Sequence, residues 1–219
     1  MVRNKAMRVF ILCTGRCGSM TFIKSCSHII NYTSSHESRI ADIGQQRLDY
    51  SDNHIEADNR LAWFLGRLDE AYGDDPFFVH LTRSSQRVAE SYVRRADFGL
   101  MHAYKNGILG YPERTKYDAI DVALDACVTI DANIRFFLRN KSCTMQLSLE
   151  NAAVDFGEFW SRIGAEGNYQ AALAEWQSKT NTSEELAQKR RTRRTPLYRR
   201  FPRKLGRILT GVPMYVRNA

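Results

Sequence analysis

The clearest hydrophobic signals in the chain are short runs that fit buried strands of a parallel sheet. The run at 9–12 is wholly apolar, and the run at 77–81 is interrupted only by His80. Residues 144–149 alternate between polar and apolar side chains, which is typical of a strand with two unlike faces. A weaker segment at 31–33 predicts one more strand, followed by a polar loop at 34–39.

Between these runs, apolar residues recur every three or four positions, which predicts amphipathic helices. The first helix carries Ile23, Cys26 and Ile30 on one face. Further helices are predicted at 61–72, 86–96, 120–138, 156–163 and 169–176. The segments 37–58 and 97–116 are polar or rich in glycine, and we expect them to be loops that shape a binding pocket.

The alternation of strands and helices predicts an α/β fold with a mostly parallel sheet and helices on both faces. Ligands of such sheets bind at the carboxyl ends of the strands, beside a change in strand order. The loops after Leu12, Thr33 and Leu81 are therefore the places where a site is expected. The predicted division is an α/β domain at 1–185 and a basic C-terminal tail at 186–219.

The net charge of +8 belongs to the tail. Residues 186–219 contain eleven Lys and Arg and no Asp or Glu, so residues 1–185 carry 21 basic and 24 acidic side chains. A nucleic acid is not expected as a partner of the domain, because the domain has no basic excess. The tail also contains apolar residues, which allows three readings: a peripheral contact with anionic lipid, a segment that packs on the domain, or a solvated basic tail.

Several classes of protein are excluded by composition. Hydrophobic residues make up 43% of the chain and charged residues 26%, as in globular proteins. No apolar run reaches the roughly 20 residues of a membrane span, and the run at 9–12 is too short for a secretory signal, so a cytoplasmic protein is expected. The five cysteines are odd in number and lack metal-ligand spacing, which predicts free thiols and no metal site.

The loop at 13–19 has the properties of an anion site, because it lies between a predicted buried strand and a helix. Backbone N–H groups of a glycine loop and a helix N-terminus attract anions, and Arg16 adds a charged fork. The loop lacks the Gly-Lys-Ser/Thr of a Walker A motif and the Gly-x-Gly-x-x-Gly of a dinucleotide site. A plain turn with a solvated arginine is the alternative interpretation.

A second pair of residues strengthens the anion interpretation. Arg83 ends the predicted strand at 77–81, and Ser91 lies eight positions later in the next helix. An arginine and a serine so placed can hold one anion between them. Their site would lie near the first loop if the two strands are neighbours in the sheet.

The two segments together resemble the sulfotransferases that use 3′-phosphoadenosine 5′-phosphosulfate (PAPS). Residues 9–22, VFILCTGRCGSMTF, resemble the 5′-phosphosulfate loop of carbohydrate-type and bacterial members, and residues 83–91, RSSQRVAES, resemble the 3′-phosphate motif. The resemblance implies a three-layer, P-loop-like fold and metal-independent sulfuryl transfer from PAPS. The cofactor-binding residues it implies are Thr14, Gly15, Arg16, Cys17, Gly18, Ser19, Met20, Arg83 and Ser91.

The chain also departs from the family pattern. Arg83 is followed by Ser84 and Ser85 instead of Asp-Pro, and Thr21 stands where cytosolic members place an aromatic residue. The basic C-terminal motif that completes the 3′-phosphate site in some members has only 189–191 (Lys-Arg-Arg) as a candidate. The residue that stacks on the adenine must therefore be another one.

Three residues are the candidates for catalysis. Arg16 would stabilise charge on the leaving phosphate, and the base that activates the acceptor hydroxyl would be Glu37 or, as its rival, His36. Glu37 is the first choice, because some family members place a glutamate in this loop. His54 and His80 are weaker candidates, since His80 lies within a predicted strand.

The acceptor expected from this resemblance is a glycan or a small alcohol. Two other functions stay open from the sequence. One is a P-loop-like nucleotide kinase, which the missing Gly-Lys-Ser/Thr disfavours. The other is a protein that binds nucleic acid or a membrane surface through the tail, with the domain as a scaffold.

Overall fold

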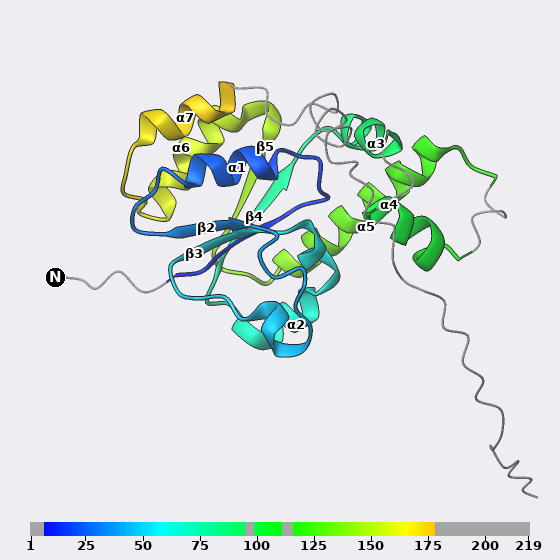
Figure 1. The fold of residues 1–219 in the computed structure, drawn as a ribbon, viewed down its shortest axis with the longest axis horizontal. Helices are drawn as coiled ribbons and strands as arrows, with labels where there is room; N and C mark the ends of the chain where they lie inside the picture. Colours follow the sequence, from blue (N-terminus) through cyan, green and yellow to red (C-terminus); the bar gives the residue numbers. More distant parts are fainter. Residues whose placement is uncertain (1–6, 95–98, 111–115, 178–219) are drawn as a thin grey trace, which may run out of the picture. The chain divides into compact units, whose positions relative to one another are not determined.

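The computed structural model describes residues 7–94, 99–110 and 116–177. Five strands form one wholly parallel sheet in the order β2-β3-β1-β4-β5 (Figure 1). The strands are β1 Val9–Leu12, β2 Thr33–His36, β3 His54–Ala57, β4 Phe77–Thr82 and β5 Thr144–Ser148. The α/β fold predicted from the sequence is confirmed.

Helices cover both faces of this sheet and make three layers (Figure 1). The α-helices are α1 Ser19–Cys26, α2 Leu65–Tyr72, α3 Ser85–Val93, α4 Leu100–Ala103, α5 Ala119–Leu138, α6 Ala152–Arg162 and α7 Tyr169–Gln177. Short turns are the 3₁₀ segments η1 Gly44–Leu48, η2 Asn59–Trp63 and η5 Leu149–Asn151, and the π-helical η3 Tyr104–Ile108.

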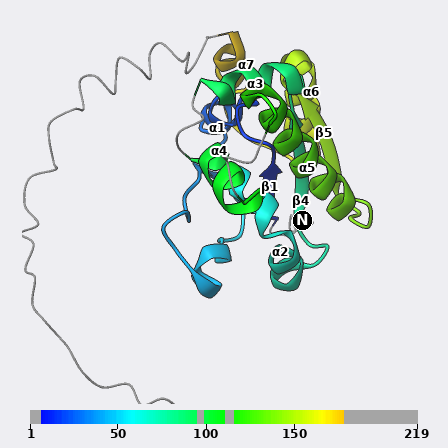
Figure 2. The same ribbon diagram turned by 90° about the vertical axis from the view of Figure 1, so that its right-hand side faces the viewer.

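Alternate residues of the strands divide the core between the two faces. Val9 and Ile11 of β1 pack with α1, α6 and α7, while Phe10 and Leu12 pack with α2 and α5. All four of these side chains are at most 1% exposed. A third cluster joins α3 to α5, which lie side by side (Figure 2). Because β1 is buried on both faces, its carboxyl end is anchored firmly beneath the loop that follows it.

Several predicted boundaries are wrong, and one strand was missed. β2 occupies Thr33–His36 rather than 31–33, so part of the predicted polar loop is strand. β3 lies inside the segment 37–58 that was predicted as loop, and its polar side chains are paired with one another and with neighbouring residues. Sequence patterns count such polar residues as solvent-exposed, although here tertiary hydrogen bonds satisfy them.

Other differences concern helix ends. The first helix stops at Cys26, and Ile30 is 78% exposed instead of extending its apolar face. The predicted helix 61–72 divides into η2 and α2, and the predicted loop 97–116 contains α4 and η3. The predicted helix 86–96 is α3, which ends at Val93.

Two further properties follow from the described residues. All five cysteines are free, as was predicted from their odd number together with their spacing. Among the described helices, none combines the length and the hydrophobicity that crossing a bilayer requires. The predicted tail at 186–219, including its basic segment 189–191, lies outside the described residues.

Candidate active site

The loop between β1 and α1 is a tight turn with left-handed backbone at three positions. The φ angles are 80° at Gly15, 60° at Arg16 and 95° at Gly18. A Cβ atom at Gly15 would lie 2.4 Å from the Tyr92 hydroxyl and 2.9 Å from Nδ2 of Asn59. Gly15 is therefore needed both for its conformation and for its lack of a side chain.

The N-terminus of α1 opens onto this loop without a side-chain cap. Gly18 occupies the capping position, and the first helical residue is Ser19. Ser19, which could have capped the helix, instead places its Oγ 3.0 Å from Nε2 of His36. The first backbone N–H groups of an α-helix have no partner within the helix, so this end attracts an anion.

The remaining residues of the predicted loop differ in what they can contribute. Thr14 and Cys17 are buried, and the Cys17 side chain packs in the core beneath α1. Met20 is 38% exposed in the first turn of α1. Cys17 can therefore meet a ligand only through its backbone.

Arg16, Arg83 and Ser91 lie together in one site. Nε of Arg16 donates to Oγ of Ser91 at 2.9 Å, and Nη1 of Arg83 donates to the carbonyl oxygen of Arg16 at 3.0 Å. This proximity arises because β1 and β4 are neighbours in the sheet, with Leu12 opposite His80. The two strands are thus neighbours, which was the condition for Arg83 and Ser91 to lie near the first loop.

Guanidinium groups gather at this site. Burial lowers the pKa of the Arg16 guanidinium, and the like charges of Arg83 and Arg94 act in the same direction. Nε of Arg83 is buried and has no hydrogen-bond partner among the residues that the structure describes. A buried donor without a partner is destabilising, and an anion bound at Arg83 would remove that penalty.

The carboxylate of Glu150, in the η5 turn that follows β5, borders the site, although no pattern in the sequence pointed to it. Burial opposes ionisation of Glu150, but the N–H of Ser84 and the hydroxyl of Ser148 donate to the carboxylate and lower its pKa. Glu150 thus accepts from the backbone at the start of α3 and supports the turn that carries Arg83. Leu149 beside it lies against Gly18.

The two candidate bases have different partners. His36 ends β2 and contacts Ser19 at the start of α1. Glu37 follows with a φ of 53°, and its carboxylate forms a 2.9 Å ion pair with Nη1 of Arg60. The imidazole therefore borders the anion loop, whereas the carboxylate is engaged by a guanidinium.

A buried ion pair holds the segment that carries Arg60. Asp58 is fully buried; it forms an ion pair with Arg47 and accepts from the N–H of Arg60 at 2.8 Å. Burial raises the pKa of Asp58, an effect that Arg47 and the N–H of Arg60 oppose. The pair fixes the start of η2 beside the site.

The other histidines are paired away from the loop. His80 contacts Asp131 of α5 at 3.0 Å, and His54 lies between Thr33 and Glu56 at 2.7 Å and 3.1 Å. These pairs support the interpretation that both histidines serve the sheet. Among the described residues, no group of three or more His, Cys, Asp and Glu could hold a metal ion.

Sequence reasoning missed Tyr92 and Asn59. The Tyr92 hydroxyl donates to the carbonyl oxygen of Thr14, and both Tyr92 and Asn59 lie against Gly15. Burial raises the pKa of Tyr92, which keeps the hydroxyl protonated as a donor. The sequence signal that could have found Tyr92 is its position directly after Ser91, in the same turn of α3.

Comparisons with known proteins support the fold. None of the protein-family models matches the chain, and no curated protein matches it. A solved structure titled as the sulfotransferase domain from the curacin biosynthetic pathway is 14% identical, with a TM-score of 0.53 over 76% of each chain. The mouse sulfotransferase SULT7A1, solved in complex with PAP, is 11% identical, with a TM-score of 0.53 over 82% of this chain and 69% of its own.

The chain therefore has the sulfotransferase fold, a P-loop-like α/β fold, as the resemblance of its two motifs implied. At sequence identities of 14% and 11%, the similarity to these structures shows only the fold. The chemistry has to be argued from the residues of the site.

Proposed function

We propose that this chain is an enzyme that transfers the sulfuryl group of PAPS to a hydroxyl acceptor. The observation that carries the proposal is the convergence of Arg16, Arg83 and Ser91 beside the uncapped start of α1. Two anion sites joined by one loop match a nucleotide with phosphates at both sugar positions. The neighbour solved with PAP has the same fold, which is consistent with this donor.

The 5′ end of the donor is assigned to the loop at 14–20. Left-handed turns at Gly15 and Gly18 bring the backbone close to a ligand, and the start of α1 supplies N–H groups and positive potential. Arg16 is the residue that stabilises the charge on the departing 5′-phosphate. Loss of one such preorganised donor typically lowers a rate by ~10²–10³.

The 3′-phosphate is assigned to Arg83 and Ser91. The buried Nε of Arg83 is a donor in need of an acceptor, and the Ser91 hydroxyl now accepts from Arg16. Bound phosphate would take up both groups and free Arg16 for the sulfuryl end of the donor. Ligands without a 3′-phosphate, such as AMP, would lack these contacts.

His36 is the base that the geometry favours. In the tautomer with its proton on Nδ1, the single lone pair of Nε2 of His36 accepts from Ser19 in the free protein. When Ser19 turns to donate to the 5′-phosphate, this lone pair is released for removal of the acceptor proton. His36 takes the acceptor proton as the acceptor oxygen bonds to sulfur. The bond from sulfur to the 5′-phosphate oxygen breaks, and its electron pair stays on that phosphate beside Arg16.

Glu37 has a supporting role in this proposal. Its carboxylate is paired with Arg60, and proton transfer to it would weaken that ion pair. The left-handed turn at Glu37 directs the chain away from β2 immediately after His36. Glu37 and Arg60 thereby fix the end of β2 on which His36 lies.

Binding of PAP, ATP and AMP to the purified full chain tests the donor. The proposal expects PAP to bind most tightly, because only PAP offers both a 3′- and a 5′-phosphate. Radiolabelled PAPS with glycan and small-alcohol acceptors then tests transfer. A preference for ATP would point to a nucleotide kinase, and nucleic acid or lipid binding that depends on 186–219 without PAP binding would point to the tail; either result overturns the proposal.

A further inference from the structure

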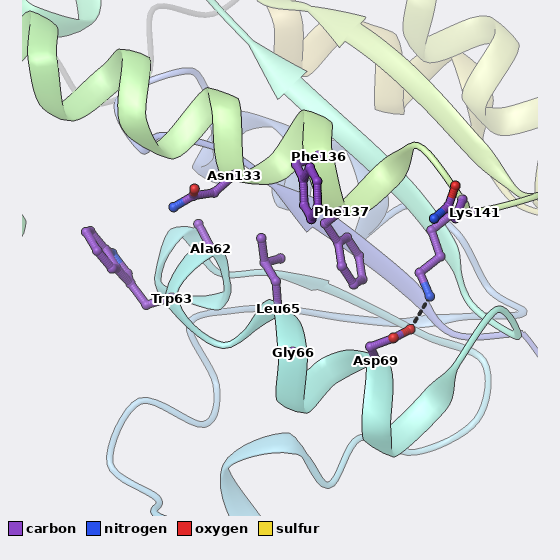
Figure 3. Close-up of a pocket in the computed structure, with 10 residues that line it drawn as sticks. Ala62, Trp63, Leu65, Gly66, Asp69, Asn133, Phe136, Phe137 and Lys141 are labelled. Carbon is purple, nitrogen blue, oxygen red and sulfur yellow. Dashed lines mark hydrogen bonds and ion pairs between the residues drawn. The ribbon is translucent and has the colours of Figure 1, made fainter.

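A groove lies between η2 and α2 on one side and α5 on the other (Figure 3). Its volume is about 450 Å³, within the range of pockets that hold small ligands. Trp63 and Asn133 lie at one end, Phe136 and Phe137 come from α5 in the middle, and Asp69 pairs with Lys141 at the other end (Figure 3). None of the site residues discussed above lines this groove.

Aromatic surface is unusually accessible here. Phe136 is 69% exposed and Trp63 is 37% exposed, although both belong to elements that otherwise pack into the core. The exposed part of such an aromatic ring does not pack against the core of the protein. Such faces suit ligands with flat C–H surfaces, as the rings of sugars have.

Polar groups without partners stand beside these rings. Asn133 of α5 and Asn140, just beyond its end, line the groove with exposed side chains, and neither amide bonds to another residue of the described ranges. An amide offers both donors and an acceptor, which match the donors and acceptors of sugar hydroxyls. A lipid chain would bury these amides without partners and is disfavoured.

The charged side chains that line the groove balance one another, although Arg139 beside the groove lies 5.3 Å from the centroid of the Phe136 ring. The ionised pair of the groove is Asp69 with Lys141, and Lys141 also donates to the carbonyl oxygen of Gly73 at 2.7 Å. Polyanions bind where cations accumulate, as they do around Arg16 and Arg83. The groove therefore favours a neutral polyhydroxylated ligand over a sulfated one or a nucleic acid.

One short element joins the groove to the reaction site. Asn59 at the start of η2 lies against Gly15, Arg60 pairs with Glu37, and Trp63 at its end lines the groove. At about 2 Å of rise per residue, the three steps from Arg60 to Trp63 advance ~6 Å. That is roughly the length of one sugar ring, so two adjacent units of one oligosaccharide could reach the groove at Trp63 and the reaction site near Arg60.

We propose that this groove binds a neutral segment of an oligosaccharide acceptor, with Trp63 and Asn133 as the subsite nearest the reaction centre. The assignment of this ligand as acceptor rests on the proposed function; binding of the saccharide itself does not. Trp63 and Phe136 stack on sugar rings, and Asn133 and Asn140 bind their hydroxyls. The terminal unit beyond Trp63 presents its hydroxyl toward His36.

Calorimetric titration of the full chain with four neutral tetrasaccharides tests the groove: maltotetraose, cellotetraose, chitotetraose and mannotetraose. We expect saturable binding of at least one, with a Kd of about 1 mM or tighter. Trp63→Ala and Asn133→Ala should each weaken it about tenfold or more, because each loses a direct contact. Val128→Ala is the matched control, since Val128 is 59% exposed on the same helix and does not line the groove.

Asn133→Ala guards against misfolding, because an exposed asparagine contributes little to stability. The proposal is overturned if no tetrasaccharide gives saturable binding, if both variants bind as the parent does, or if a heparin tetrasaccharide outcompetes the neutral ligands. PAP binding, measured on the same samples, should be equal in the parent and in Trp63→Ala. Failure of PAP to bind the parent overturns the proposed function, whereas Trp63-dependent saccharide binding still supports the groove.

Discussion

Nε of Arg16 donates to the hydroxyl of Ser91 at 2.9 Å, which joins the loop after β1 to the helix after β4. The two residues are 75 positions apart in the chain. This bond is made in the free protein. The proposed donor would engage the two residues at different phosphates, so we expect the bond to be exchanged when the donor binds. The Arg16–Ser91 hydrogen bond is therefore the state of the free protein from which ligand binding begins.

Ser91→Ala and Arg83→Ala are expected to lower the affinity for PAP and leave the affinity for AMP nearly unchanged. Hydrogen bonds to a charged group contribute about 1.5–3 kcal/mol, which corresponds to roughly a ten- to hundredfold change in Kd. Arg87→Ala is the control, because Arg87 is exposed on the same helix. Equal losses of affinity for PAP and AMP would show that Arg83 and Ser91 do not bind the 3′-phosphate.

His36→Ala is expected to lower kcat by ~10²–10⁴, the usual contribution of a general base, with little change in PAP affinity. Glu37→Gln keeps the shape of the side chain and weakens the ion pair with Arg60, so a smaller loss is expected. The measurement is steady-state turnover with an accepted alcohol, and His102→Ala serves as the control, because the His102 side chain in α4 is exposed. Near-normal turnover of His36→Ala together with inactive Glu37→Gln would return the base role to Glu37.

Gly15→Ala tests the close packing of the loop. The added Cβ would meet the Tyr92 hydroxyl at 2.4 Å, and the φ of 80° disfavours any side chain. We expect a loss of roughly 1–3 kcal/mol in stability and a loss of PAP binding. Gly44→Ala carries a similar strain at φ 60° with nothing within 4 Å, so it separates strain from crowding. If both variants behave alike in PAP binding and thermal unfolding, crowding against Tyr92 is not important.

The buried thiols should react slowly at a pH where ordinary cysteines react. Burial raises the pKa of Cys127 to about 12 and raises those of Cys13 and Cys26 above the ordinary 9.0, with the Cys17 hydrogen bond as the main cause at Cys13. The folded protein therefore keeps these protons more tightly than the unfolded chain. Stability is lost as the pH rises from about 9 toward 12, since only the unfolded state releases its protons there.

A disulfide reagent at pH 8 measures this difference. One fast-reacting thiol is expected in the native protein, the exposed Cys143, and five in denaturant. Cys143→Ser should abolish the fast phase and leave thermal stability unchanged. Fast modification of a second thiol in the native state would contradict the burial of the other four.

The sequence predicts well those parts of the fold that local pattern determines. The apolar run of β1, the helical spacing of α5 and the glycine loop between β1 and α1 each show their structure in neighbouring residues. Arg83 and Ser91 were also predictable, because eight positions across a strand end and a helix place both at one edge of the sheet. Their proximity to Arg16 follows from the adjacency of β1 and β4 in the sheet.

What the sequence could not predict depends on distant partners. β3 was missed because His54 and Glu56 look solvent-exposed until Thr33 and Ser38 are seen to hydrogen-bond with them. The choice of Glu37 or His36 as the base stays a prediction, and the ion pair of Glu37 with Arg60 that bears on it is not visible in the sequence. Patterns along the chain report burial and periodicity, but not which of two adjacent polar residues turns inward.

β2, which carries His36, is the outermost strand at its end of the described sheet. A border strand with unpaired backbone groups invites association with other chains, yet Thr-Ser-Ser-His is too short and too hydrophilic to nucleate it. In the proposed reaction, a bulky acceptor would therefore reach the imidazole from this border strand without passing the donor. The surface around β2, and not the depth of a tunnel, would then limit the size of the substrate.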